Sequence, residues 1–167
     1  DVESDLSILL ALRAELEVRE RTLSEAARQE REQARADRAA GILRISSKSV
    51  LWCAFNNEVW IKKVVLGPET TLVQAYAFAG CVNLEEVEYA NVKTFAASAF
   101  EGCAQLKTVV RYGAVVLGEQ DLEYVNESAF ANCNMLTRVE GLHTVKAIGS
   151  RAFYMCSALL VFVSEAP

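Results

Sequence analysis

The motif Ala-Phe-x-x-Cys-x-x-Leu occurs four times in this chain of 167 residues, and this repetition constrains the fold more than any other feature. Its copies begin at residues 77, 99, 129 and 152, and a degenerate fifth copy begins at Ala54 with Glu58 at the Cys position. Successive phenylalanines lie 23, 22, 30 and 23 residues apart, and an apolar residue recurs five positions before and nine positions after each. Repetition at this period is typical of a solenoid, in which each copy buries its apolar face against its neighbours.

The first forty residues have a different composition and predict one long helix. They contain no proline, glycine or aromatic residue and are rich in the strong helix formers Ala, Leu, Glu and Arg. Gly41 follows at the position of a C-terminal cap, and a helix of about 38 residues would be about 57 Å long. We therefore expect a helical arm over residues 1–41 and a repeat region over residues 42–167. Opposite charges at helical spacing are expected to pair, as Glu15 with Arg19, Glu17 with Arg21 and Arg28 with Glu32.

An apolar stripe along this helix predicts a contact with a partner. The stripe follows a heptad spacing, is interrupted at Asp5 and Arg19, and ends before Glu30, so about three heptads are usable. Two interpretations stay open: a short coiled coil, or a long helix that lies on a neighbour or is only partly ordered. The residues expected to bind a partner here are Leu9, Leu12, Leu16 and Leu23.

From Gly41 onward the chain resembles a known repeat family. The stretch that carries the resemblance best is Val145-Lys-Ala-Ile-Gly-Ser-Arg-Ala-Phe-Tyr-Met-Cys-Ser-Ala-Leu159. This pattern, recurring over about residues 50–164, resembles the BspA-like class of leucine-rich repeats. The first copy, which lacks the cysteine, and the long third interval depart from the pattern. The resemblance implies a curved α/β-type solenoid of about five repeats, with one short parallel strand per repeat, that binds other macromolecules. It implies neither an enzyme nor a cofactor.

The repeat logic predicts the place of each strand and the role of the recurring cysteine. Phe should fill the interior, and Cys is small and apolar enough to stack in a buried column of free thiols. A metal site would need paired ligands close in sequence and usually histidine, but each repeat carries one cysteine and the single histidine is His143. We therefore interpret the cysteines as packing residues and expect no metal or cofactor. Strands are predicted at residues 61–66, 84–89, 106–111, 136–141 and 159–164.

The residues between the core positions of these strands should form an exposed face. Glu lies next to Lys or Thr on adjacent predicted strands, which favours cross-strand pairing and a self-neutralised surface. The last strand differs because it is apolar on both sides, which makes an uncovered edge. Either further repeats follow there, or the edge meets a partner, including a second copy. The edge residues expected to bind are Leu160, Val161 and Val163.

Two other segments interrupt the repeat. The third interval carries about seven extra residues within 111–120, which we expect to fold back as an extra strand and to offer Tyr112, Val115 and Val116 to a partner.

At the N-terminal end of the repeat region, an open solenoid needs a cap. Leu51, Trp52 and the upstream helix are candidates for that cap. We expect three residues to pack under the first repeat: Leu43, Trp52 and Trp60.

Composition and motifs exclude several classes of function. The net charge of −5 is evenly shared, which argues against nucleic-acid binding, and no apolar run approaches the length of a membrane span. There is no Gly-rich phosphate loop, no Gly-x-Ser-x-Gly elbow and no His-Glu-x-x-His motif. We expect His143 to be a surface residue in a turn, and we expect no catalytic residues.

The resulting hypothesis is a non-catalytic scaffold. Its solenoid would bind a macromolecular partner, and its helix would mediate oligomerisation or docking. A charged helix combined with reduced thiols favours a cytoplasmic, cytoskeleton-associated protein. The alternative is a cell-surface repeat protein or adhesin that binds host or matrix ligands, which the resemblance also implies.

Overall fold

The structure is a computed structural model that describes residues 2–113 and 122–160, with the backbone alone for residues 2–6. Contacts divide the chain into two compact units, with the division between Ala39 and Ala40. Each unit is described by itself below.

The first unit is helix α1, which spans Val2–Ala39 and matches the predicted length of 38 residues. Of the three predicted ion pairs, the one between Arg28 and Glu32 forms. Arg28 Nε lies 3.0 Å from a carboxylate oxygen of Glu32. Another predicted pairing is wrong, because Glu17 pairs with Arg13 at 3.2 Å, one turn before it, rather than with Arg21. Glu15 and Arg19 form no ion pair among the described residues.

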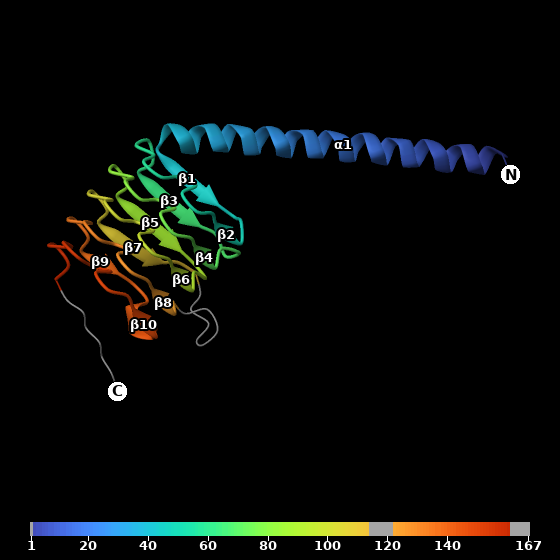
Figure 1. Cartoon of the computed structure of the whole chain (residues 1–167). Coiled ribbons are helices and arrows are strands. Elements are labelled where there is room, and N and C mark those ends of the chain that lie inside the picture. Colours follow the sequence, from blue (N-terminus) through green and yellow to red (C-terminus); the bar gives the residue numbers. More distant parts are fainter. Residues whose placement is uncertain (1, 114–121, 161–167) are drawn as a thin grey trace. The chain divides into compact units, whose positions relative to one another are not determined.

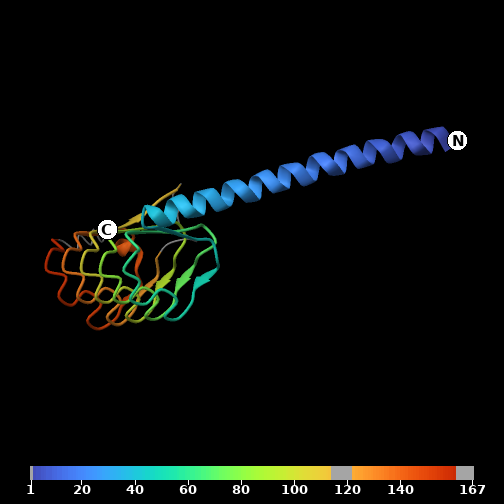
Figure 2. The same cartoon turned by 90° about the horizontal axis from the view of Figure 1, so that it is seen from above.

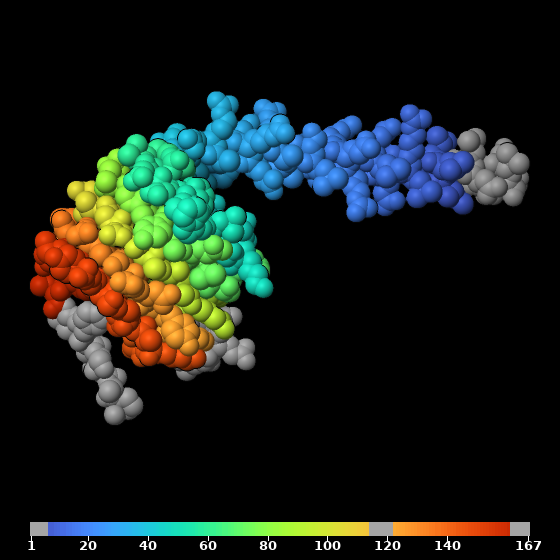
Figure 3. Space-filling model, in the orientation of Figure 1, coloured from blue at the N-terminus to red at the C-terminus, as the bar shows by residue number. Residues whose placement is uncertain are grey.

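The second unit is a coil of short parallel strands that form two sheets (Figure 1). The first sheet has the order β1-β3-β5-β7-β9 and the second the order β10-β8-β6-β4-β2, so each repeat adds one strand to each sheet. Viewed from above, the turns of the coil follow one another (Figure 2), and the space-filling view shows each repeat beside the next in sequence order (Figure 3). The strands of the first sheet are β1 Ile42–Ile45, β3 Lys63–Leu66, β5 Glu86–Tyr89, β7 Thr108–Arg111 and β9 Arg138–Val139. Those of the second sheet are β2 Ser49–Val50, β4 Leu72–Val73, β6 Thr94–Phe95, β8 Tyr124–Val125 and β10 Ala147–Ile148. A short 3₁₀ helix, η1, spans Leu142–Thr144.

The predicted strands overlap the observed first sheet but begin two residues too early. Leu84 is buried as expected, yet its backbone N–H bonds to the Cys81 carbonyl, so it closes a turn instead of starting the strand. Leu106 and Leu136 do the same with the cysteines of their repeats. Strand β1 and the whole second sheet were not predicted. Of the last predicted strand, Leu159 and Leu160 are not in a strand, and the rest lies outside the described residues.

A ladder of phenylalanines forms the centre of the core. The rings of successive repeats stack nearly parallel at centroid distances of 5.2–5.5 Å, which is the offset-stacked range for aromatic pairs. Phe55 takes part, so the degenerate first copy is a true repeat. Phe95 packs edge-on against two rungs of the ladder. The sequence therefore located the core correctly. The rungs are Phe55, Phe78, Phe100, Phe130 and Phe153.

Each repeat also uses two left-handed backbone positions, two residues before and two residues after its Phe. Both positions have φ between 52° and 73° in all five repeats. The later position holds Gly or Asn in four repeats, which are the residues that tolerate this conformation, but Met155 in the fifth. The earlier position holds Cys53, Tyr76, Ser98, Ser128 and Arg151, none of which signals a left-handed turn in the sequence.

The predicted N-terminal cap is partly wrong. Leu43 and Trp60 pack against the core as expected, but Trp52 is 66 % exposed and Leu51 is also exposed. Trp52 lies three residues before its Phe, at a position where none of the five repeats buries its side chain. The backbone of that turn directs the side chain at this position away from the core, so Trp52 stays exposed although it is hydrophobic. The first repeat is therefore not covered by Leu51 and Trp52.

Candidate interaction surfaces

The outward side chains of β3, β5, β7 and β9, with Glu85 and Lys107 directly before β5 and β7, form a polar surface, here called the charged face. The ammonium of Lys63 lies 2.6 Å from a carboxylate oxygen of Glu88 and 3.3 Å from one of Glu86 on the next strand. Lys107 and Glu85 make a third contact at 2.7 Å. These pairs confirm the predicted cross-strand neutralisation, because the parallel register places Lys63 beside Glu86.

The ion pairs keep Lys63 and Glu85 of the charged face in their charged forms near neutral pH. The hydrogen bond to the Glu88 carboxylate raises the pKa of Lys63, and the hydrogen bond from Lys107 lowers the pKa of Glu85. Both shifts favour the charged forms. The charged face therefore carries fixed alternating charges on a rigid ladder of strands, which suits recognition of a complementary polar surface.

A second group at the C-terminal ends of these strands was missed by the sequence analysis. The hydroxyl of the buried Tyr89 donates to the carbonyl oxygen of Glu140 at 2.7 Å. The Glu140 carboxylate in turn accepts from the backbone N–H of Arg111 at 2.8 Å and forms an ion pair with Arg138. This group links three repeats, and Gly141 leaves room for it because a Cβ there would lie 2.4 Å from the Tyr89 hydroxyl. Its contacts are non-local, so repeat periodicity did not predict them.

The recurring cysteines form a buried column of free thiols, as the repeat logic predicted. Three are fully buried, and each thiol donates to the Phe carbonyl oxygen of the preceding repeat at a sulfur–oxygen distance of 3.0–3.2 Å. Burial raises the pKa of Cys81 to about 11 and also raises the pKa of the other three. Neutral hydrogen-bonded thiols are poor nucleophiles, so the column stabilises the coil rather than reacting. Its members are Cys81, Cys103, Cys133 and Cys156.

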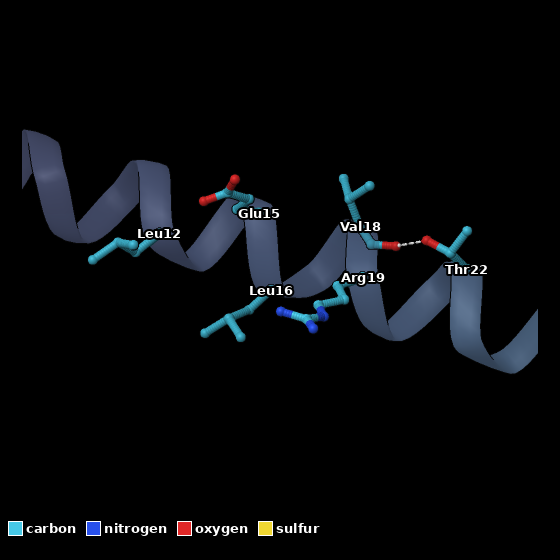
Figure 4. Close-up of a pocket in the computed structure, with 6 residues that line it drawn as sticks. All are labelled: Leu12, Glu15, Leu16, Val18, Arg19 and Thr22. Atoms are coloured by element: carbon cyan, nitrogen blue, oxygen red, sulfur yellow. Dashed lines mark hydrogen bonds between the residues drawn. The ribbon is translucent and has the colours of Figure 1, made fainter.

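The apolar stripe of helix α1 is exposed in this unit. All four predicted leucines are between 50 and 65 % exposed, and a shallow surface depression lies between Leu12 and Thr22. Figure 4 shows Leu12 and Leu16 on one side of the helix, with the Arg19 guanidinium directed back toward Leu16. Glu15 and Val18 point to the other side (Figure 4). Leu10 and Val18 are exposed as well, so apolar side chains are not confined to the stripe.

The remaining predicted binding residues fall on the repeat region. Tyr112 is half-exposed, but its hydroxyl donates to the Leu66 carbonyl oxygen at 3.0 Å, so its ring is anchored two repeats back. Leu160 is 83 % exposed, and Ile148, a core position in other repeats, is 47 % exposed, so the last described repeat is open. The other predicted residues lie outside the described part of the chain, as does the predicted extra strand. These residues are Val115, Val116, Val161 and Val163.

No metal constellation is found among residues 2–113 and 122–160. His143 is exposed in η1, which confirms the predicted surface histidine in a turn. Within the same residues, no group of three or more His, Cys, Asp and Glu side chains is placed to hold a metal ion. A search of the described helices finds none with the length and apolar character needed to cross a membrane.

The repeated geometry can now be compared with known proteins. The sequence profile of the BspA type leucine rich repeat region matches residues 42–160 in six copies. The chain belongs to this family. The six copies exceed the five phenylalanine repeats predicted from the sequence.

One solved structure of a leucine-rich repeat protein shows the same fold, and two others match with lower TM-scores. A leucine-rich repeat protein from Bacteroides ovatus is 29 % identical with a TM-score of 0.52, over 65 % of this chain and 26 % of that one. The chain thus spans about a quarter of that protein's length. A leucine rich cell surface protein from Faecalibacterium prausnitzii is 20 % identical, with a TM-score of 0.38, over 60 % of this chain and 31 % of that one. A leucine rich repeat protein from T. pallidum is 16 % identical, with a TM-score of 0.34, over 72 and 78 % of the two chains. No curated protein sequence matches the chain.

Proposed function

We propose that this BspA-type repeat chain is a non-catalytic interaction module with two binding elements. The charged face of the repeat region binds a protein partner, and helix α1 mediates self-association or docking. The proposal does not include an enzymatic activity or a cofactor.

One observation carries the helical part of the proposal. Four leucines at heptad spacing stay at least half exposed in a helix of 38 residues. A solvated helix gains nothing from such a stripe, whereas a partner helix would bury it. The family supports the other part, since repeat solenoids present extended binding surfaces built from successive repeats.

A pair of matched leucine variants tests self-association. Leu16→Glu places a charge on the stripe, whereas Leu10→Glu makes the same chemical change at an equally exposed position outside it. Sedimentation equilibrium should find an oligomer for the unaltered chain and for Leu10→Glu, and a monomer for Leu16→Glu. If the unaltered chain sediments as a monomer at high concentration, helix-mediated self-association is wrong.

Partner binding by the charged face is tested by reversing one of its charges. Lys107→Glu replaces the ion pair to Glu85 with a repulsion, and Lys48→Glu is the control because Lys48 is exposed and lies outside the charged face. Affinity capture from extracts of the native cells should recover a protein with the unaltered chain and with Lys48→Glu. That protein should be lost with Lys107→Glu. Equal recovery by all three would exclude the charged face as the binding surface.

The cytoplasmic, cytoskeleton-associated location is proposed from the charged helix and the free thiols. The thiols alone do not separate the compartments, because buried hydrogen-bonded thiols are protected from oxidation in any of them. Localisation of the tagged full-length protein, with protease treatment of intact cells, separates it from the cell-surface alternative. Digestion of the tagged protein in intact cells would contradict a cytoplasmic location.

A further inference from the structure

We propose that the occupant of the leucine stripe on helix α1 is a second copy of the same helix, running antiparallel to the first. This inference rests on the self-association proposed above and adds the orientation and the register. The stripe is short, so the polar residues that interrupt and flank it decide how two helices align. Three charge features of the helix select the antiparallel arrangement.

The first feature is the pair of charged residues within the stripe. In a parallel dimer, each stripe position faces its own counterpart, so Arg19 would face Arg19 and Asp5 would face Asp5. Both contacts bring like charges together in a desolvated seam, but only the Arg19 contact distinguishes the two orientations, because Asp5 faces Glu30 of the second copy in the antiparallel register described next. In an antiparallel dimer that aligns Leu12 with Leu23 of the second copy, Arg19 instead faces Leu16. Arg19 and Leu16 line the same depression within one helix (Figure 4), and the Arg19 stem is long enough to cover a leucine while its guanidinium stays in water.

The second feature is the set of charges that flank the stripe. Parallel helices bring Glu15 of one copy next to Glu20 of the other, and twofold symmetry makes this repulsion occur twice. In the antiparallel register, Arg13 of each copy lies beside Glu20 of the other, which gives two attractions. Arg13 and Glu20 are both exposed, and the surface ion pair of Arg13 with Glu17 within one helix is weak enough to be exchanged for this contact.

The third feature is the charge asymmetry of the whole helix. Residues 1–20 contain six acids and two arginines, for a net charge of −4, whereas residues 21–40 contain four acids and five arginines, for a net charge of +1. A parallel dimer would place the two acidic halves side by side. In the antiparallel register, residues 1–14 instead lie opposite residues 21–34, which carry three acids and three arginines and so have no net charge, and the repulsion between acidic halves is removed.

The arrangement determines the spacing of the repeat regions. In this register residue n lies opposite residue 35 − n, so the two Ala39 residues are 43 residues apart along the dimer axis. At 1.5 Å per residue this is about 65 Å, compared with about 10 Å in a parallel dimer. The repeat regions therefore begin at opposite ends of the helix pair, and the dimer presents two repeat regions to a partner.

The charge variant Glu20→Arg distinguishes the two orientations because its expected effects have opposite signs. In the antiparallel dimer it turns both attractions with Arg13 into repulsions, and the dimer dissociation constant of the full chain, measured by sedimentation equilibrium at low salt, should rise about tenfold. In a parallel dimer it would relieve both repulsions with Glu15 and tighten the dimer. The double variant Arg13→Glu with Glu20→Arg keeps the net charge and should restore the original dissociation constant to within about threefold.

Disulfide trapping gives an independent readout of the same contacts. Mixing chains that carry Arg13→Cys with chains that carry Glu20→Cys should give a mixed disulfide between these positions, identified by peptide mass spectrometry. A mixed disulfide between Glu15→Cys and Glu20→Cys chains instead would overturn the orientation and leave self-association intact. Unchanged dissociation constants in all charge variants would also overturn it. A monomeric unaltered chain would overturn self-association itself.

Discussion

Alkaline pH should destabilise the repeat region through its buried thiols, and Cys81 gives the clearest case. Its side chain is fully buried, and its thiol donates to the Phe55 carbonyl oxygen at 3.1 Å. Burial, with a smaller effect from the nearby charge of Glu58, raises its pKa to about 11 from an ordinary value of 9.0. The folded state therefore holds this proton to a higher pH than the unfolded chain does.

The sign and size of the effect follow from this difference. Below pH 9 both states keep the proton, so the full stability is present. Between pH 9 and pH 11 the unfolded chain loses its proton first, so the free energy of unfolding falls by up to about 1.4 kcal/mol per pH unit. Across the two units the thiol of Cys81 alone accounts for a loss of about 3 kcal/mol.

Urea unfolding followed by far-UV circular dichroism, from pH 8 to pH 11 with a reducing agent, measures this loss. Cys81→Ala is the matched variant, because every other titrating group is unchanged and cancels in the comparison. At pH 8 the variant should be about 1 kcal/mol less stable, since it lacks the thiol hydrogen bond. As the pH rises, the unaltered chain should lose its advantage and become the less stable of the two. Parallel stability curves across this range would refute the argument.

Three further predictions concern the packing of the coil, and urea unfolding at pH 7 checks each of them. Gly149→Ala should destabilise the repeat region by about 3 kcal/mol or more, because a Cβ there would lie 2.3 Å from the backbone nitrogen of Glu127. Gly102→Ala is the control, because a Cβ there would meet no atom closer than 3.9 Å. It should lower the free energy of unfolding by about 1 kcal/mol, from the left-handed φ of 73° alone. Equal losses of stability in the two variants would contradict the steric argument. Phe100→Ala should cost about 4 kcal/mol, because Phe100 is fully buried and stacks on both neighbours in the ladder, and a loss below about 2 kcal/mol would show that the ladder is loosely packed. Met155→Gly should raise the free energy of unfolding by about 0.5–1 kcal/mol, because it removes the backbone strain of a non-glycine residue at a φ of 59°. A lower stability would show that the methionine side chain stabilises the turn.

The sequence predicted the parts of this fold that repeat at fixed offsets. Phe78 and Cys81 lie where the spacing placed them, because the same position in each neighbouring copy needs the same size and polarity. Phe55 was included despite the missing cysteine, since its offsets to the surrounding apolar residues were intact. The cross-strand ion pairs followed from the same alignment.

What the sequence did not predict depends on backbone direction and on contacts between distant repeats. The turn before Phe55 points Trp52 into solvent, and hydrophobicity alone could not show that direction. The left-handed residues such as Tyr76 have no sequence signal because the stacked turn imposes their conformation. The bond from Tyr89 to the Glu140 carbonyl spans 51 residues, which exceeds any repeat spacing. On the helix, the stripe could be located from its heptad spacing, but its partner could not.

The thiol hydrogen bonds also have a consequence for how such a chain evolves. The second to fifth repeats each donate a thiol to the repeat before them, and the first four each accept this bond at their Phe carbonyl. A unit that donates in one direction and accepts in the other can be duplicated or deleted in frame without leaving a mismatched junction. The number of repeats can therefore change by unequal recombination, while every surviving thiol hydrogen bond keeps its geometry.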